Sequence, residues 1–139
     1  MIFRPDWEAV ITPVIDHLAN RSDVDQGRIA LWCLSMGGYL APRAAAFEHR
    51  LAALIADGGV YDIVGGTAQE QIPSETLHNM KMMIIGDMME KPDHYNAWFQ
   101  NMMSSSTNLR WSIEHGMYSF GKNTPVDYYI ALSQMSMDG

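Results

Sequence analysis

The sequence predicts an α/β fold in which a short pair of parallel strands, flanked by helices, is followed by a helical region. The apolar runs Arg28–Leu34 and Leu51–Ala56 have the length and continuity of strands that are buried on both faces of a parallel sheet. An alanine-rich segment of helical character lies between them. A crossover of this length between parallel strands is the βαβ unit, and its right-handedness is nearly obligatory.

Residues 1–62 form the first of two predicted regions and begin with a helix. Asp6 is a plausible N-cap for this helix, because apolar residues recur at helical spacing after it. Pro13 lies inside the helical pattern and should bend the helix or mark its first turn. Residues 20–27 are rich in turn formers and have no periodicity, so a loop connects the helix to the first strand.

Residues 63–139 form the second region, which has the pattern of helices joined by polar or Gly/Pro-containing turns. The boundary lies near residues 64–67. Apolar residues at helical spacing predict helices around residues 77–88, 95–102 and 111–120.

Composition excludes several classes of function. Hydrophobic residues make up 47% of the 139 residues, which favours one packed domain over disorder. The net charge of -7 and the absence of a basic cluster argue against nucleic acid as a partner. No apolar run approaches the ~20 residues that cross a bilayer, so no membrane partner is expected. A single cysteine and the lack of a signal-peptide pattern predict a cytoplasmic protein.

The stretch CLSMGG contains the candidate catalytic residue, Ser35, directly after the first predicted strand. A nucleophile elbow needs a serine on a sharp strand-to-helix turn with small neighbours, and Gly37 and Gly38 meet that need. Cys33 departs from the G-x-S-x-G pattern because it carries a Cβ where the pattern has none. The alternative is that Ser35 only caps the following helix.

Several segments together resemble the α/β-hydrolase superfamily: Phe3–Glu8, Arg28–Leu31, Ser35–Ala45, Arg50–Ala53 and Gly58–Asp62. The most similar branch holds 2,6-dihydroxypseudooxynicotine hydrolase and the fungal polyketide-shortening hydrolases. In that branch a helical lid follows the second of these strands, and Arg110–Met117 with Phe120 and Gly121 resembles part of it. The resemblance covers essentially the whole chain, and its specific part is the elbow.

The resemblance implies a partial α/β-hydrolase fold, with a core at residues 1–62 and a lid at 63–139. It implies that Ser35 is the nucleophile and that the backbone N–H of Met36 is one oxyanion donor. It also implies that earlier strands, which bring the second oxyanion donor, lie outside this sequence. The acid and the histidine of the triad would follow the lid, and they would also lie outside this sequence.

A serine hydroxyl needs a base to accept its proton and an acid to orient that base. We therefore ask which residues of this chain could replace the triad histidine and acid. His115 follows Glu114 in the predicted lid and is a weak candidate for the base. Asp57 follows the second strand, where an acid could reach the site, although a capping or turn role is the alternative. The other four histidines are expected at the surface. No two histidines have ligand spacing on one helix, so no metal is predicted, and no cofactor is expected.

Methionine is the other unusual feature, with twelve in the chain. Those in the presumed lid include Met80, Met82, Met83, Met88, Met89, Met102 and Met103. Adaptable side chains of this kind fill irregular helical cores. They could also line a pocket for a bulky apolar or aromatic carbonyl substrate, and both roles can hold together.

Two parallel strands do not form a stable sheet alone, so something must cover their edges and faces. We therefore expect a homo-oligomer, association with a second polypeptide, or association with the missing parts of the fold. Two functions remain open. One is a serine hydrolase that cleaves an ester, amide or ketonic carbon–carbon bond. The other is a catalytically incomplete fragment or a binding and assembly module.

Overall fold

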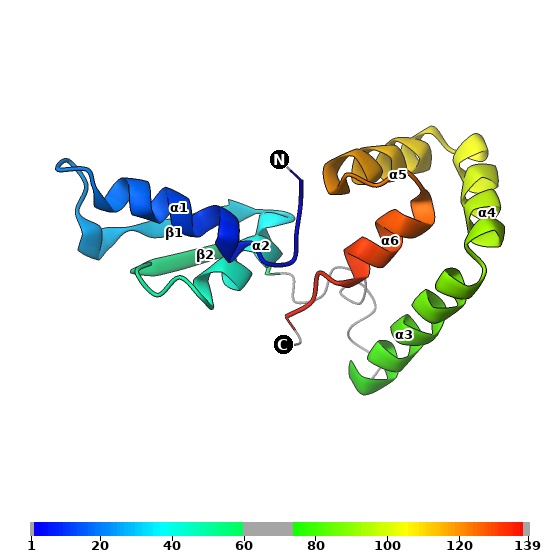
Figure 1. The fold of residues 1–139 in the computed structure, drawn as a ribbon, viewed down its shortest axis with the longest axis horizontal. Coiled ribbons are helices and arrows are strands. Elements are labelled where there is room, and N and C mark those ends of the chain that lie inside the picture. The colour runs from blue at the N-terminus through cyan, green and yellow to red at the C-terminus, as the bar shows by residue number, and fades with distance from the viewer. Residues whose placement is uncertain (1, 60–73, 138–139) are drawn as a thin grey trace. The chain divides into compact units, whose positions relative to one another are not determined.

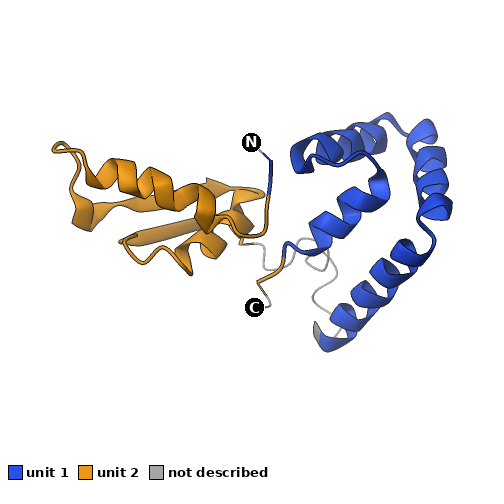
Figure 2. Cartoon of the chain, viewed as in Figure 1, with its two compact units in different colours: residues 1–3, 63–135 blue, residues 4–62, 136–139 orange. Residues whose placement is uncertain are grey.

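The computed structural model describes residues 2–59 and 74–137. Its elements in chain order are α1 (Glu8–Ala19), the 3-10 helix η1 (Gln26–Arg28), β1 (Ala30–Leu34), α2 (Gly37–Ala45), β2 (Ala53–Asp57), α3 (Ser74–Glu90), α4 (Pro92–Ser105), α5 (Thr107–Phe120) and α6 (Pro125–Ser133) (Figure 1). The chain divides into two compact units (Figure 2). We call residues 4–62 with 136–139 the sheet unit, and residues 1–3 with 63–135 the helical unit.

The sheet unit confirms the predicted parallel strand pair with flanking helices. β1 and β2 pair in parallel, in a register that runs from Ala30 opposite Ala53 to Leu34 opposite Asp57. α2 packs against both strands, and α1 packs against α2. Tyr39 of α2 is fully buried, and its hydroxyl donates a hydrogen bond to the Ser136 carbonyl over 3.4 Å. The core of this unit therefore lies between α2 and one face of the sheet.

The other face of the sheet is apolar and exposed. Paired residues of parallel strands point to the same face, so Trp32 and Ile55 lie side by side there with Leu34 one step further along. Their exposed fractions are 64%, 53% and 59% in the same order. Within the described residues this face is uncovered, as expected of two strands whose apolar faces need a further partner. The physical reason is that only α2 covers the strands extensively, and it covers one face.

Two local predictions near the strands and α1 are corrected. The first strand begins at Ala30 and not at Arg28, because residues 26–28 form η1. The Asp25 carboxylate accepts a hydrogen bond from the Gly27 N–H over 3.0 Å and so stabilises this turn. Asp6 does not cap α1, because its carboxylate is bound to the Arg4 guanidinium instead.

A buried carboxylate anchors the segment between α2 and β2. Glu48 is only 4% exposed, and both of its oxygens accept hydrogen bonds from the Arg50 guanidinium, over 2.7 and 2.6 Å. These bonds stabilise the charged form and lower the pKa of Glu48 from 4.5 to about 2. Arg50 also donates to Asp16 of α1 over 2.7 Å. The pair therefore ties this segment to the end of α1.

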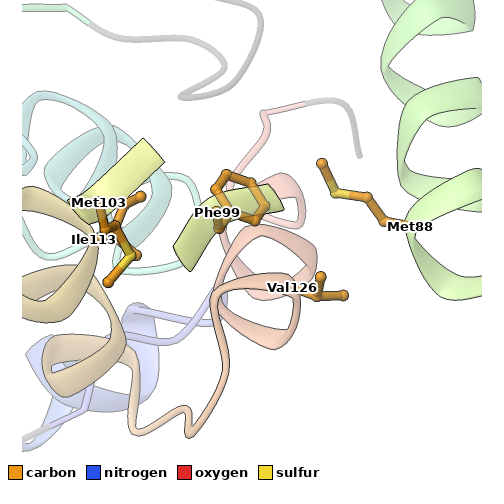
Figure 3. Close-up of a cluster of buried hydrophobic side chains, with 5 residues drawn as sticks. All are labelled: Met88, Phe99, Met103, Ile113 and Val126. Atoms are coloured by element: carbon orange, nitrogen blue, oxygen red, sulfur yellow. The ribbon is translucent and has the colours of Figure 1, made fainter. Parts of the chain in front are cut away.

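The helical unit has its own apolar core, formed by four helices. The buried side chains at its centre are Met88, Phe99, Met103, Ile113 and Val126 (Figure 3). α6 packs against α3, α4 and α5, and Phe99 stacks on Tyr129 of α6 with 4.7 Å between ring centroids. Gly116 of α5 lies directly against the Tyr128 ring of α6, where any side chain would collide with the ring.

The fourth helix of this unit, α6, was not predicted from the sequence. The Thr124 side chain caps it by accepting a hydrogen bond from the Asp127 N–H over 3.1 Å, and Pro125 occupies its first turn. Its apolar residues do not follow a single stripe, because Val126 and Leu132 are buried while the residues between them are half-buried or exposed. The cap and the proline are the local signals that mark where this helix starts.

The methionines divide between the core and the surface. Met88 and Met103 are buried, as expected of adaptable core side chains. Met82, Met83 and Met89 of α3 are exposed, by 54%, 68% and 63%.

Within the described residues, no helix combines the length and the apolar character needed to cross a bilayer.

Candidate active site

Ser35 occupies the sharp turn between β1 and α2. Its φ is +54°, and it is the one non-glycine residue with a positive φ in the described part of the chain. For an L-residue this left-handed conformation costs roughly 1–2 kcal/mol, so it persists only where the surrounding structure imposes it. A strained serine between a strand and a helix is the backbone form of a nucleophile elbow.

The hydrogen bonds of this turn use the backbone of Ser35 and not its hydroxyl. The Gly38 N–H donates to the Ser35 carbonyl over 2.7 Å, and the Tyr39 N–H donates to the Met36 carbonyl over 3.1 Å. No side chain caps α2, and the exposed Ser35 hydroxyl makes no hydrogen bond with any described residue. This geometry supports the nucleophile over the helix cap.

The two glycines after Ser35 allow the close approach that the elbow requires. A Cβ on Gly37 would lie 2.5 Å from the Cβ of Cys33. A Cβ on Gly38 would lie 2.8 Å from the Gly59 nitrogen and 3.2 Å from the Asp57 carbonyl oxygen. The elbow accommodates the side chain of Cys33 because Gly37 has none.

The Cys33 thiol is partly buried, and this burial raises its pKa. The elbow therefore places a neutral thiol two residues before the serine, on the same side of β1 as α2.

The Met36 N–H is available as an oxyanion donor. Met36 lies at the N-cap of α2, with φ -51° and ψ -32°, and its N–H has no acceptor among the described residues. The first N–H groups of a helix lack intrahelical partners and carry the positive end of the helix dipole. An oxygen that becomes negative beside Ser35 would be stabilised there.

Asp57 lies beside the elbow, at the carboxyl end of the neighbouring strand. Its Cα pairs with that of Leu34, the residue before Ser35. Its carboxylate is exposed and forms no ion pair or side-chain hydrogen bond with any described residue.

Gly58 and Gly59 follow with φ of +111° and +49°. A Cβ on Gly58 would lie 3.4 Å from the Ser35 carbonyl oxygen and 3.7 Å from its Cα. This glycine turn therefore lines the candidate site beside Ser35. Sequence reasoning did not identify it, although a Gly-Gly pair directly after a strand is its signal.

His115 belongs to the helical unit and not to the sheet unit that holds Ser35 and Asp57. It lies on α5, is exposed, and stacks on Trp111 with 5.1 Å between ring centroids and 5° between ring planes. The other four histidines are exposed as well. Among the residues that the structure describes, no group of three or more His, Cys, Asp or Glu side chains could hold a metal ion.

The chain is similar in sequence to a known protein family and to several curated proteins. Residues 11–115 match the model of the prolyl oligopeptidase family. Among curated proteins, the chain is 29% identical over 140 residues to "20-hydroxy-prefusarin hydrolase FUS2" of Gibberella moniliformis, an alignment that covers 98% of this chain and 32% of that protein. It is 30% identical over 141 residues to "Hydrolase acrC" of Aspergillus aculeatus, covering 98% of this chain and 31% of that protein. No solved structure matches the chain significantly.

A further relative, "Hydrolyase ccsE" of Aspergillus clavatus, is 42% identical over 153 residues, covering 96% of this chain and 30% of that protein. The chain thus spans about a third of the length of the curated relatives it matches. The family match extends over the elbow and the helices that follow it, and the strained serine turn agrees with it. The chain therefore belongs to the prolyl oligopeptidase family, within the α/β-hydrolase superfamily.

Proposed function

We propose that this chain is the nucleophile-bearing part of a serine hydrolase and that Ser35 attacks a substrate carbonyl. The observation that carries the proposal is the positive φ of Ser35 at the end of β1, which places beside each other a hydroxyl and a helix N–H that make no hydrogen bond with the described residues. A residue held in a strained backbone conformation at a strand-to-helix turn is typical of this catalytic arrangement.

The reaction that we propose has two steps. The Ser35 oxygen bonds to the carbonyl carbon while its proton passes to a base, and the Met36 N–H stabilises the oxyanion. Collapse of this intermediate breaks the bond to the leaving group, which takes the proton from the protonated base, departs as an alcohol, an amine or a C–H compound, and leaves an acyl-serine. Water then attacks the acyl-serine, releases the acid and restores the hydroxyl.

Attack by Ser35 requires a base that accepts the proton of its hydroxyl. A serine, its base and the orienting acid act as a unit, so removal of any one costs most of the rate. Because the relatives are about three times as long as this chain, we propose that a histidine from another part of the hydrolase serves as base. His115 is the candidate within the chain, and it lies in the other unit.

The substrate that we propose is a small molecule with a bulky apolar or aromatic group next to its carbonyl. The composition of the helical unit supports this class, since Met82, Met83 and Met89 are exposed, and Trp98 and Trp111 are exposed by 48% and 66%. Polarizable and aromatic side chains are typical linings of apolar ligand sites. We place the protein in the cytoplasm, in keeping with its single cysteine.

Hydrolysis of a p-nitrophenyl ester by the chain together with the part of the hydrolase that supplies the base tests the role of Ser35. Ser35→Ala should reduce the rate to that of the buffer, because the hydroxyl that forms the acyl intermediate is gone. Ser22→Ala, which removes an exposed serine elsewhere in the sheet unit, should leave the rate unchanged. Equal rates for the wild-type chain and Ser35→Ala would contradict the proposal.

The second candidate function is a non-catalytic binding and assembly module, and the exposed apolar face of the sheet favours it. Trp32, Leu34 and Ile55 give the isolated unit a surface that normally contacts a neighbour. This module would form a homo-oligomer or bind the remaining parts of a hydrolase. Light scattering after size-exclusion chromatography should show an oligomer, and a stable monomer with no esterase activity would contradict both candidates.

A further inference from the structure

Asp57 carries the charge at the catalytic edge of the sheet. Residues 33–38, which form the elbow, and Gly58 and Gly59, which face it, have no charged side chain. The Asp57 carboxylate is exposed and is not neutralised by any cation among the described residues. Among these described residues Asp57 is therefore the one charged side chain, and the dipole of α2 and solvent also contribute to the potential beside Ser35.

The distance between the two residues follows from their places in the sheet. Asp57 pairs with Leu34, and Ser35 is the next residue along the chain. Adjacent strands lie ~4.8 Å apart and each residue rises ~3.3 Å, so the Cα atoms of Asp57 and Ser35 are separated by about 6 Å. The contact of Gly58 with the backbone of Ser35, 3.4 to 3.8 Å from the Cβ position of that glycine, fixes this proximity.

We infer that Asp57 is a specificity-determining residue that excludes anionic substrates from the site of Ser35. The inference rests on the proposed function and adds a substrate class to it: neutral or cationic carbonyl compounds are accepted, and those with a carboxylate, sulfate or phosphate near the scissile carbonyl are rejected. The cause is direct repulsion by an unpaired negative charge within a Debye length, which is ~10 Å at 0.1 M salt.

A thiol placed at the nucleophile position measures this potential without any need for catalysis. In a Cys33→Ala background, Ser35→Cys provides one thiolate, which attacks a methanethiosulfonate reagent, forms a mixed disulfide and releases methanesulfinate. The rates are measured with the cationic trimethylammonium-ethyl reagent and with the anionic sulfonato-ethyl reagent. Their ratio reports the sign and strength of the local potential.

Asp57→Asn should lower the ratio of the cationic to the anionic rate about sevenfold at low salt. At about 7 Å in water, a unit charge changes each rate about 2.7-fold, in opposite directions for the two reagents. Asp25→Asn removes a charge at the other end of β1, about 16 Å or more from the elbow, and should change the ratio by less than about 2.5-fold. Circular dichroism confirms that each variant is folded.

A second measurement needs no substitution at Asp57. Raising the salt from 10 mM to 1 M shortens the Debye length from ~30 to ~3 Å, so the ratio measured with Asp57 present should fall toward its value in Asp57→Asn. An unchanged ratio in Asp57→Asn, or an equal change in Asp25→Asn, would overturn the inference. Failure of the proposed function is a separate result, because it is read from ester hydrolysis by the chain with Ser35 intact.

Discussion

The packing of α2 against the end of β2 depends on a glycine, and Gly38→Ala is the substitution that tests it. An added Cβ would lie 2.8 Å from the Gly59 nitrogen and 3.2 Å from both the Asp57 carbonyl oxygen and the Gly58 carbonyl carbon. Real Cβ atoms essentially never approach another atom within 3.0 Å. All three neighbours are backbone atoms, so the strain cannot be relieved by rotating a side chain.

The expected cost is about 2 kcal/mol of unfolding free energy. Overpacking of a closed site costs ~1–3 kcal/mol, and the gain from replacing a glycine in a helix is smaller, because Gly38 is only the second residue of α2. A loss of this size lowers the melting temperature of a chain this long by about 8 °C. Urea denaturation followed by tryptophan fluorescence gives the free energy directly.

Two other glycines provide matched controls. Gly27→Ala, in the same unit, meets only the Asp25 carboxylate at 3.4 Å and should change stability by less than ~0.5 kcal/mol. Gly86→Ala meets nothing within 4 Å in the middle of α3 and should stabilise the helical unit by up to ~1 kcal/mol. If Gly38→Ala is as stable as the wild-type chain, the close contact between α2 and the glycine turn is refuted.

Two further predictions follow, one for the sheet unit and one for the helical unit. Arg50→Ala should lower the urea midpoint at pH 7, because it removes the two guanidinium hydrogen bonds that the buried Glu48 carboxylate accepts. The pKa of Glu48 is about 2 in the folded chain, below its ordinary 4.5, so this stabilisation is complete above pH ~5 and is lost as the pH falls toward 2. Urea midpoints at pH 7 and pH 3 should therefore differ more for the wild-type chain than for Arg50→Ala, and an equal pH effect would contradict the pairing. In the helical unit, Gly116→Ala should cost about 2 kcal/mol by collision with the Tyr128 ring. Tyr128→Ala should relieve much of that cost, so a double variant whose losses simply add would count against the contact.

The strained turn at Ser35 was predictable because its sequence signal is local. Ser35 lies between a continuous apolar run and a helical segment, and the small residues that a sharp turn needs directly follow it. The sequence could not show the contact between Gly58 and Ser35, because that contact depends on the register of two strands that are separated by α2.

The elements that were predicted wrongly have competing local chemistry. The first strand starts two residues later than its apolar run, because the Asp25 carboxylate stabilises a turn across residues 26–28. α6 went unrecognised because its apolar residues do not follow one stripe, so periodicity gave no signal even though Thr124 and Pro125 mark its start. The exposed face at Trp32 and Ile55 looks like a buried strand in sequence, since burial depends on what covers the sheet.

The positive φ of Ser35 has a consequence for selection experiments on this chain. Glycine adopts that conformation without strain and asparagine tolerates it better than serine, so the residue that suits the backbone best is not the one that suits the chemistry. A library screened for thermal stability alone should therefore accumulate glycine or asparagine at position 35 and lose the proposed nucleophile. A library screened for hydrolysis should retain serine there and gain its stability elsewhere.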